Sequence, residues 1–508
     1  IEKPNAGIKS TIEEFPVVTA YTGDCTDIEG SSPIINAVDR DQWGDAGLDL
    51  EAMDLRFDAG DDFFCHVNGG WYNNFVMPED KTRYSAFTIL SDKSEARVKT
   101  IIEELAAAAS DVATLEGKVA AFYNAFLNTA AIENAGLSSA KAYLNKIAAI
   151  DSRADLAVTF ATVGFSSPIG GWVDVDSKDT KNHIFYLTQS GLGLPDRDMY
   201  LTDDGKNIET REGYLGYLTL LIGAAGYADA PAVASRVLAL ETQIAAAHWD
   251  RTVGRNRDLT YNKLSRAEVI AMGGDFPVDV MLKSFGLEEQ ASFVVRQVTP
   301  EEAEITELGL SAEQVVKISG GGIAGLFSVM NQANLEDWKA YLSAHFLSDH
   351  ASVLPAAIDQ ASFDFYSKQL RGQAQQRPRW KRAVRAVEGA LGEAVGKVYA
   401  ARHFPPENKA AMDVLVSNLR RAMADNLNQL DWMGEVTKIE ARDKLAKFTP
   451  KIGYTEKFET YDSLAVSDSA FNNAMAASQW GFTDMLSKLG QPIDKTEWFM
   501  LPQTVNAY

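Results

Sequence analysis

Apolar residues recur at helical spacing along most of this chain, and this periodicity constrains the fold more than any other feature. From Arg97 onward, Val98, Ile101, Ile102 and Leu105 lie on one helical face, and an Ala-rich stretch follows. Similar patterns predict helices at about 114–127, 136–148, 212–224, 229–249, 280–286, 335–347, 380–401 and 407–429. The sequence therefore predicts a mainly α protein with small β elements.

Two segments differ from the helical pattern. Apolar residues around Trp172 and Ile184 flank a polar run, which predicts a β-hairpin over 170–189. The stretch Trp498-Phe-Met-Leu-Pro-Gln-Thr-Val505 also has a strand-like composition, and Pro502 confines it to an edge or an irregular strand.

Composition excludes several classes of protein. The chain has 508 residues, of which 46% are hydrophobic and 23% charged, as in soluble globular proteins. Its 48 Lys and Arg against 70 Asp and Glu give a net charge of −22, which argues against nucleic-acid binding because phosphate contacts need a basic surface. No apolar run reaches the roughly 18 residues of a membrane span, so no transmembrane segment is expected.

The start of the chain and its two cysteines leave alternatives open. The sequence begins at Ile1 without a basic and apolar leader, so a signal peptide was either removed or never present. Gly, Pro, Ser, Thr and Asp are scattered through 1–57, which reads as an irregular leader. Cys25 and Cys65 either form one disulfide or remain two free thiols.

The histidines and aspartates do not form a recognisable metal motif. None of the six histidines has another four residues away, the spacing that places two zinc ligands on one helical face, so we expect ordinary surface or loop histidines. Asp174, Asp176 and Asp179 lack the Gly and Glu of a calcium loop, and we expect a solvated hairpin turn there.

Two further motifs have ordinary explanations. Gly320-Gly-Gly322-Ile-Ala-Gly325 matches a dinucleotide fingerprint, but no second strand follows it, and we interpret it as a flexible loop. The basic cluster over 371–385 is interpreted as a helix that begins near Pro378 and whose cations pair with the chain's excess carboxylates. No serine-hydrolase elbow or cysteine-protease signature is present.

A series of short motifs, in one order, resembles the neprilysin-like (M13) zinc metallopeptidases. The motifs are Gly60-Asp-Asp-Phe-Phe64, Val67-Asn-Gly-Gly-Trp71, Arg83-Tyr-Ser-Ala-Phe87, Gln189-Ser-Gly-Leu-Gly-Leu-Pro-Asp-Arg-Asp-Met-Tyr200, His248-Trp249, Thr260-Tyr-Asn262, Arg377-Pro-Arg-Trp-Lys-Arg382, Phe404-Pro-Pro406, Leu430-Asp-Trp-Met433, Lys444-Leu-Ala-Lys-Phe-Thr-Pro-Lys-Ile-Gly-Tyr454 and Val505-Asn-Ala-Tyr508. Together they cover nearly everything after about residue 58. Asn68 stands where animal relatives commonly carry a cysteine, so the chain is most similar to the bacterial branch.

The resemblance implies a two-lobed architecture. A helical cap lobe encloses a cavity against a thermolysin-like catalytic lobe that carries zinc. On this basis residues 1–58 form the irregular leader, 59–430 the cap lobe, and 431–508 the linker helices and the beginning of the catalytic lobe, ending in the substrate-binding strand.

The chain departs from the family pattern at its end. The HExxH helix, which supplies two zinc ligands and the general base, is expected a few tens of residues after the Asn-Ala-Tyr motif, and the 508 residues do not contain it. Without zinc there is neither an activated water nor a Lewis acid. We therefore predict no catalytic residue and no metal ligand in this chain, and no peptidase activity of the chain alone.

The resemblance also implies substrate-binding residues. Asn506 and Ala507, followed by Tyr508, match the family motif that binds an extended peptide backbone along an edge strand. Arg83 matches a position where a guanidinium pairs with a peptide carboxylate, and Phe87 an apolar wall of the S1′ pocket. The structural alternatives are an ion pair for Arg83 and a core position for Phe87. Thr88 and Ser91 differ from the family's usual polar subsites, so carboxylate selectivity is expected to differ.

Two functions therefore remain. The first is the N-terminal, substrate-enclosing part of a zinc metalloendopeptidase that hydrolyses short peptides, with oligopeptides as substrates and a C-terminal segment or second chain carrying HExxH. The second is a non-catalytic peptide-binding or interaction protein derived from the same fold. A plain helical scaffold explains neither the C-terminal motif nor the order of motifs. Loss of a leader before Ile1 fits a periplasmic or secreted protein.

Overall fold

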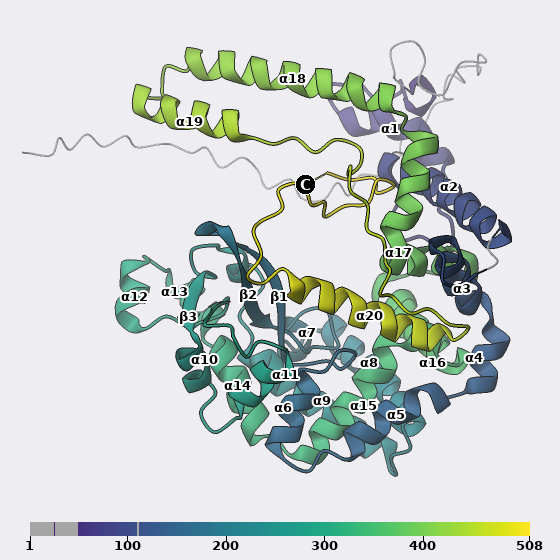
Figure 1. Cartoon of the computed structure of the whole chain (residues 1–508), viewed down its shortest axis with the longest axis vertical. Coiled ribbons are helices and arrows are strands. Elements are labelled where there is room, and N and C mark those ends of the chain that lie inside the picture. Colours follow the sequence, from purple (N-terminus) through teal and green to yellow (C-terminus); the bar gives the residue numbers. More distant parts are fainter. Residues whose placement is uncertain (1–24, 26–48, 109–110, 508) are drawn as a thin grey trace, which may run out of the picture. The chain divides into compact units, whose positions relative to one another are not determined.

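The computed structural model describes residue 25 and residues 49–108 and 111–507 (Figure 1). The described residues form two compact units, which divide after Pro78. Most of the predicted leader, 1–58, lies outside the described residues. The predicted boundaries at 58 and 430 remain predictions.

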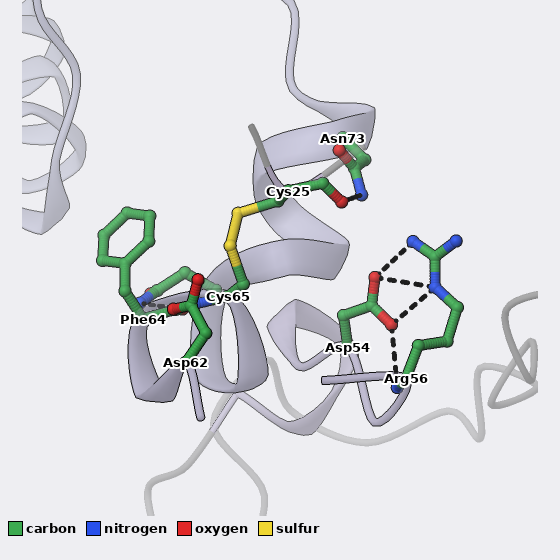
Figure 2. Close-up of a disulfide and its surroundings, with 8 residues drawn as sticks. Cys25, Asp54, Arg56, Asp62, Phe64, Cys65 and Asn73 are labelled. Atoms are coloured by element: carbon green, nitrogen blue, oxygen red, sulfur yellow. Dashed lines mark hydrogen bonds and ion pairs between the residues drawn. A yellow bond between two sulfur atoms is a disulfide. The ribbon is translucent and has the colours of Figure 1, made fainter. Parts of the chain in front are cut away.

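The unit that precedes Glu79 contains a short 3-10 helix, η1 (Leu50–Ala52), and α1 (Phe63–Asn74). Asp62 caps α1 by accepting a hydrogen bond from the Cys65 amide at 2.9 Å. Cys65 forms a disulfide with Cys25, whose carbonyl oxygen accepts a 3.3 Å hydrogen bond from the Asn73 side chain (Figure 2). Of the two alternatives for the cysteines, the disulfide is therefore the one observed.

The unit from Glu79 onward is mainly helical. Its longer helices are α2 (Ala86–Ala108), α3 (Leu115–Leu127), α5 (Ser138–Ala148), α8 (Gly205–Ala224), α9 (Ala230–Ala247), α14 (Gly322–Gln332), α15 (Leu335–Asp349), α17 (Arg379–His403), α18 (Pro406–Gln429), α19 (Glu435–Lys447) and α20 (Ala470–Ser487). Its shorter ones are α4 (Thr129–Ala135), α6 (Arg153–Phe160), α7 (Asp198–Leu201), η2 (Val253–Arg255), α10 (Arg266–Met272), α11 (Val278–Ser284), α12 (Glu302–Glu307), α13 (Ala312–Ile318), η3 (Ala351–Val353), α16 (Ala356–Ser362) and the π-helix η4 (Phe363–Gln369). The predicted helices are all present.

The predicted hairpin forms β1 (Ile169–Asp176) and β2 (Asp179–Gln189). Two short strands, β3 (Asn262–Ser265) and β4 (Ser292–Val295), complete a sheet of order β1-β2-β4-β3, in which β2 and β4 run parallel and the other pairs antiparallel. Trp172 and Tyr186 face each other across the hairpin with stacked rings 5.2 Å apart. The mainly α fold with small β elements is confirmed.

The core centres on α8, α9 and α15, which lie close together in Figure 1. Trp338, Tyr341 and Phe346 of α15 are fully buried. A carboxylate, Glu241 of α9, is also fully buried and accepts hydrogen bonds from four donors. The donors are the Gly193 amide at 3.0 Å, Tyr200 Oη at 2.5 Å, Tyr214 Oη at 2.8 Å and His345 Nε2 at 3.0 Å.

Two element predictions need correction. Helix α2 begins at Ala86 rather than near Arg97. Its first turns were not predicted because their apolar side chains are exposed and the buried stripe starts only at Ser94. The stretch 498–505 forms no strand: Thr504 N–H closes a turn on Leu501 C=O at 3.0 Å, and Pro502 has no N–H to donate to a sheet.

The glycine-rich segment before α14 is packed rather than flexible. A Cβ at Gly320 would lie 2.2 Å from the Ala246 carbonyl oxygen, and one at Gly322, whose φ is +56°, 2.3 Å from that of Gln297. The preceding segment is helix α13 rather than a strand. These glycines therefore allow close backbone approach, and they do not form a dinucleotide site.

None of the helices in the described part of the chain combines the length and apolarity needed to cross a membrane.

Candidate substrate-binding site

Phe87 lies in the first turn of α2, and Arg83 lies three residues before the helix begins. The Ser85 amide donates to Thr88 Oγ1 at 3.1 Å and fixes this first turn. Phe87 is 65% exposed, so it is not a core aromatic. Arg83 is exposed and makes no hydrogen bond or ion pair with any described residue. Among the described residues neither side chain has the structural role considered for it, and both are exposed.

One face of α2 connects these residues with the C-terminal segment of the chain. Phe87, Ser91 and Ser94 recur at intervals of four and three, which places them on one side of the helix. Ser94 is buried, and its Oγ donates to the Gln503 carbonyl at 2.7 Å. At a rise of about 1.5 Å per residue, Phe87 lies roughly 10 Å along α2 from this contact.

The C-terminal segment is held between α2 and α17. Gln503 is 4% exposed, and its Nε2 donates to the Gly392 carbonyl of α17 at 3.2 Å. Cβ atoms at Gly392 and Gly396 would lie 2.4 Å from Leu501 and 2.8 Å from Pro502, respectively. Glycine at both positions thus lets the segment lie directly on the helix.

A change in the direction of α17 occurs beside this contact. Leu391 has non-helical angles, φ −134° and ψ 31°, inside the helix. It directly precedes Gly392, whose carbonyl accepts the Gln503 hydrogen bond. The backbone break therefore lies at the point where α17 binds the C-terminal segment.

Charged side chains lie close to Gln503 of the C-terminal segment. Burial raises the pKa of the Glu388 carboxyl, and the charge of Glu95 raises it further, whereas Gln503 and two arginines oppose the shift. Glu95 itself pairs with Arg377. Gln503 Oε1 is buried and accepts no hydrogen bond from the described residues.

The final motif is exposed but is not a strand. Asn506 and Ala507 are exposed and lie outside regular secondary structure, and Tyr508 lies outside the described residues. The predicted edge strand is wrong because no described strand lies alongside 505–507 to pair with it. The Asn506 amide nevertheless lies three residues after Gln503, and so close in the chain to the Ser94 contact.

The described residues do not fit a zinc site. They contain no group of three or more His, Cys, Asp or Glu side chains placed to hold a metal ion. The expectation of ordinary surface or loop histidines is wrong for His345, which lies within α15, is buried and is hydrogen-bonded to Glu241. His248 and His350 lie just after helix ends, as the loop alternative expects, but they too are buried and hydrogen-bonded. Their helices and loops pack into the core, a property that the spacing between histidines does not reveal.

The aspartates of the hairpin are also more structural than expected. Asp176 is 1% exposed and accepts hydrogen bonds from Tyr261 at 2.6 Å and Lys263 at 2.7 Å. The expectation of a solvated turn is wrong at this position because β3 places Lys263 against the hairpin.

The interpretation of the basic cluster is confirmed for four of its six cations. Helix α17 begins after Pro378, and these four pair with carboxylates from other elements, whereas Arg371 and Arg385 form no ion pair with a described residue. The pairs are Arg377 with Glu95, Lys381 with Asp80 at 2.9 Å, and Arg379 and Arg382 with Asp359.

Comparisons with known proteins agree on one family. The model of peptidase family M13 matches residues 59–455. Mouse endothelin-converting enzyme 1 is 26% identical over 479 residues, covering 90% of this chain and 59% of that protein. Human neprilysin is 26% identical over 494 residues, covering 90% of this chain and 64% of that protein. The chain thus spans about three fifths of the length of these relatives.

Solved structures support the same assignment. The zinc metalloprotease Zmp1 of Mycobacterium tuberculosis, in complex with an inhibitor, has a TM-score of 0.81 and 33% identity, covering 91% of this chain and 67% of that one. PepO from a Lactobacillus, at 18% identity and a TM-score of 0.71, shares the fold, covering 88% of this chain and 68% of that one. The family model, the relatives and the architecture together show that this chain belongs to peptidase family M13.

Proposed function

We propose that these residues form the substrate-enclosing part of a zinc metalloendopeptidase that hydrolyses short peptides. The observation that carries the proposal is the M13 match over 59–455. Because the relatives are longer and no described group fits a metal ion, we assign the zinc ligands and the general base to a part of the protein outside these 508 residues. When bound there, zinc would activate water and polarise the scissile carbonyl.

The residues at the beginning of α2 supply the recognition in this proposal. Arg83, exposed and without an ion pair among the described residues, binds the C-terminal carboxylate of the peptide. Phe87, 65% exposed, forms the apolar wall of the neighbouring subsite. Asn506 and Ala507, with Tyr508 after them, bind the peptide backbone, which makes recognition tolerant of sequence.

Peptide binding tests the recognition step. Labelled peptides with a free C-terminal carboxylate are titrated against the chain and compared with their C-terminal amides. Arg83→Gln should weaken binding of the free acid about tenfold and leave the amide unchanged, because a charge-assisted hydrogen bond is lost. Lys93→Gln removes an exposed cation from the same helix and should change neither. Equal loss for acid and amide would contradict the role of Arg83.

A hydrolysis assay tests whether the zinc ligands lie outside these 508 residues. Quenched fluorescent peptides incubated with the 508-residue chain and zinc should show no chelator-sensitive hydrolysis. Such hydrolysis would contradict the assignment of the zinc ligands to another part of the protein. A non-catalytic binding protein would also bind peptide without turnover. This second function is consistent with the described residues, which contain no group placed to hold a metal ion. Zinc-dependent hydrolysis by the longer gene product separates the two.

We also propose that the protein works in the periplasm or outside the cell. Support comes from the disulfide between Cys25 and Cys65, because such bonds persist in oxidising compartments. Fractionation of the source cells with immunodetection tests this, and recovery in the cytoplasm would contradict it.

A further inference from the structure

A cavity remote in sequence from α2 has a basic lining. It has a volume of about 480 Å³ and lies where β2 ends, between the loop after β2 and the loop after α9. Its charged lining consists of Arg197, Arg251, Arg255, Arg296 and one carboxylate, Asp196. Four cations against one anion are unexpected in a chain whose net charge is −22.

The protein neutralises these arginines only in part, and Arg197 Nε lies 3.7 Å from Asp198 Oδ1. Arg255 is exposed and forms no ion pair with a described residue, and Arg251 has only a 3.7 Å contact with Asp196. Arg296 donates to the Gly254 carbonyl at 2.9 Å and lies 5.8 Å from the centre of the Trp172 ring, without a carboxylate partner among the described residues. Guanidinium groups of this kind are the usual ligands of phosphate.

Another cavity with four arginines provides an internal comparison. It has a volume of about 490 Å³ and is lined by Arg371, Arg377, Arg382 and Arg385. There, Arg377 pairs with Glu95 and Arg382 with Asp359. Arg371 and Arg385 form no ion pair with a described residue, so each cavity has two arginines without a carboxylate partner. The cavities differ in their other two arginines: Arg377 and Arg382 hydrogen-bond their carboxylates, whereas the ion pairs of Arg197 and Arg251 are contacts of 3.7 Å.

Gln297 supplies a further donor to the cavity beside β2. It is 3% exposed, and its Oε1 accepts hydrogen bonds from the Gln189 amide at 3.0 Å and from Thr188 Oγ1 at 3.2 Å. Because a backbone amide can only donate, these contacts fix which side of the Gln297 amide is oxygen. The remaining Nε2 donates to no described residue, although the side chain lines the cavity.

Arg197 has unused donors as well. Its Nη1 donates to the His248 carbonyl at 2.7 Å, at the C-terminal end of α9. Its Nε is buried and makes no hydrogen bond with a described residue, although it lies 3.7 Å from Asp198 Oδ1. A buried donor of this kind normally has a partner, and a ligand can supply one.

We propose that this cavity binds a phosphate-type oxyanion, either free or as the phosphate group of a small metabolite. A tetrahedral dianion can accept several charge-assisted hydrogen bonds from different directions, which suits guanidinium groups arranged around it. A single carboxylate would leave most of them unpaired. The lowered pKa of the Arg296 guanidinium, caused by burial and then by repulsion from Arg257, fits a cluster that lacks its counter-ion.

Calorimetric titration of the 508-residue chain with inorganic phosphate and with glycerol 3-phosphate, against chloride at equal ionic strength, tests the proposal. Both phosphates should bind, and the tighter one identifies whether the free anion or the ester is preferred. Arg255→Gln should weaken binding about tenfold, because it removes a charged donor without breaking an ion pair among the described residues. Gln297→Glu keeps the acceptor for Gln189 and should weaken binding further by repulsion.

The control is Arg371→Gln, which makes the same charge change at an exposed arginine in the other cavity. It should leave phosphate binding unchanged. Thermal unfolding without phosphate shows whether each variant is folded. If neither phosphate binds the unsubstituted chain, or if Arg255→Gln and Arg371→Gln weaken binding equally, the proposal is wrong.

Discussion

Helices α15 and α18 are similar in kind but opposite in environment. Nine of the fifteen residues of α15 are buried, whereas α18, with 24 residues, buries only Leu427. On α18 the apolar residues Leu415, Leu419 and Met423 lie on one face and are 48%, 62% and 53% exposed. Both segments form helices, but only α15 buries most of its side chains against the rest of the protein.

The partner helix α19 has the same character. It packs against α18 (Figure 1), and Arg420 donates to the Leu445 carbonyl at 3.0 Å. Its own apolar residues Val436 and Ile439 are 78% and 58% exposed. Exposed apolar faces of this extent indicate a surface that another part of a protein covers. On the proposed function, the longer M13 protein would supply that cover.

The largest difference is expected in hydrogen exchange. Amides of α15 can exchange only after the core opens, whereas amides of α18 and α19 need only local opening. Exchange measured by mass spectrometry should be slower in α15 by on the order of a thousandfold. Equal protection in both helices would contradict the comparison.

The stability of the buried core around α15 depends on Glu241. Glu241→Ala leaves Tyr200, Tyr214, His345 and the Gly193 amide without their acceptor. Urea unfolding should show a loss of about 4 kcal/mol, as when one member of a buried charged network is removed. Asp337→Ala is the control: Asp337 pairs at the surface with Arg236 at 2.8 Å, and its loss should cost less than about 1 kcal/mol. Equal losses of unfolding free energy in the two variants would contradict a central structural role of Glu241.

A buried histidine, His248, makes the free energy of unfolding depend on pH in the acid range. Burial lowers the pKa of His248 from 6.5 to about 4. Below pH 6.5 the unfolded chain therefore binds a proton that the folded chain excludes, so stability falls as the pH drops from 6.5 to about 4. The shift corresponds to about 3 kcal/mol. In His248→Gln, the free energy of unfolding should depend less on pH by this amount across that window; an unchanged profile would contradict the prediction.

His345 should act in the opposite direction. Burial lowers the pKa of its imidazole, but the charge and hydrogen bond of Glu241 raise it by more, so the net pKa is raised above 6.5. Its contribution is complete below pH 6.5 and is lost as the pH rises through the raised value. His345→Gln should therefore flatten the unfolding free energy on the alkaline side, and a change on the acid side alone would contradict this.

The sequence predicted those elements whose stability is local. The polar run between Trp172 and Ile184 indicated a hairpin, and the hairpin is present. The start of α2 was missed because Phe87 and Leu90 are exposed and contribute no buried stripe. Periodicity detects the buried face of a helix rather than the helix itself.

The candidate site depended more on tertiary contacts. The family resemblance selected Arg83 and Phe87, but only the structure excluded a core position for Phe87. The strand expected over 498–505 fails because Gln503 is fixed by Ser94 and Gly392, residues far away in the sequence. His345 is likewise hydrogen-bonded to Glu241, a residue to which no local sequence pattern links it.

The smallest effect on stability is expected on the exposed face of α18. Leu419→Gln replaces a side chain that is 62% exposed, so the free energy of unfolding should change by less than about 0.5 kcal/mol. Phe346→Ala, in the buried part of α15, should cost about 4 kcal/mol and serves as the matched core substitution. Because Leu419 is part of an exposed apolar face, its replacement should instead reduce self-association of the chain, measured by sedimentation velocity. A large loss of stability in Leu419→Gln would mean that α18 already contributes to the core, and the contrast with α15 would not hold.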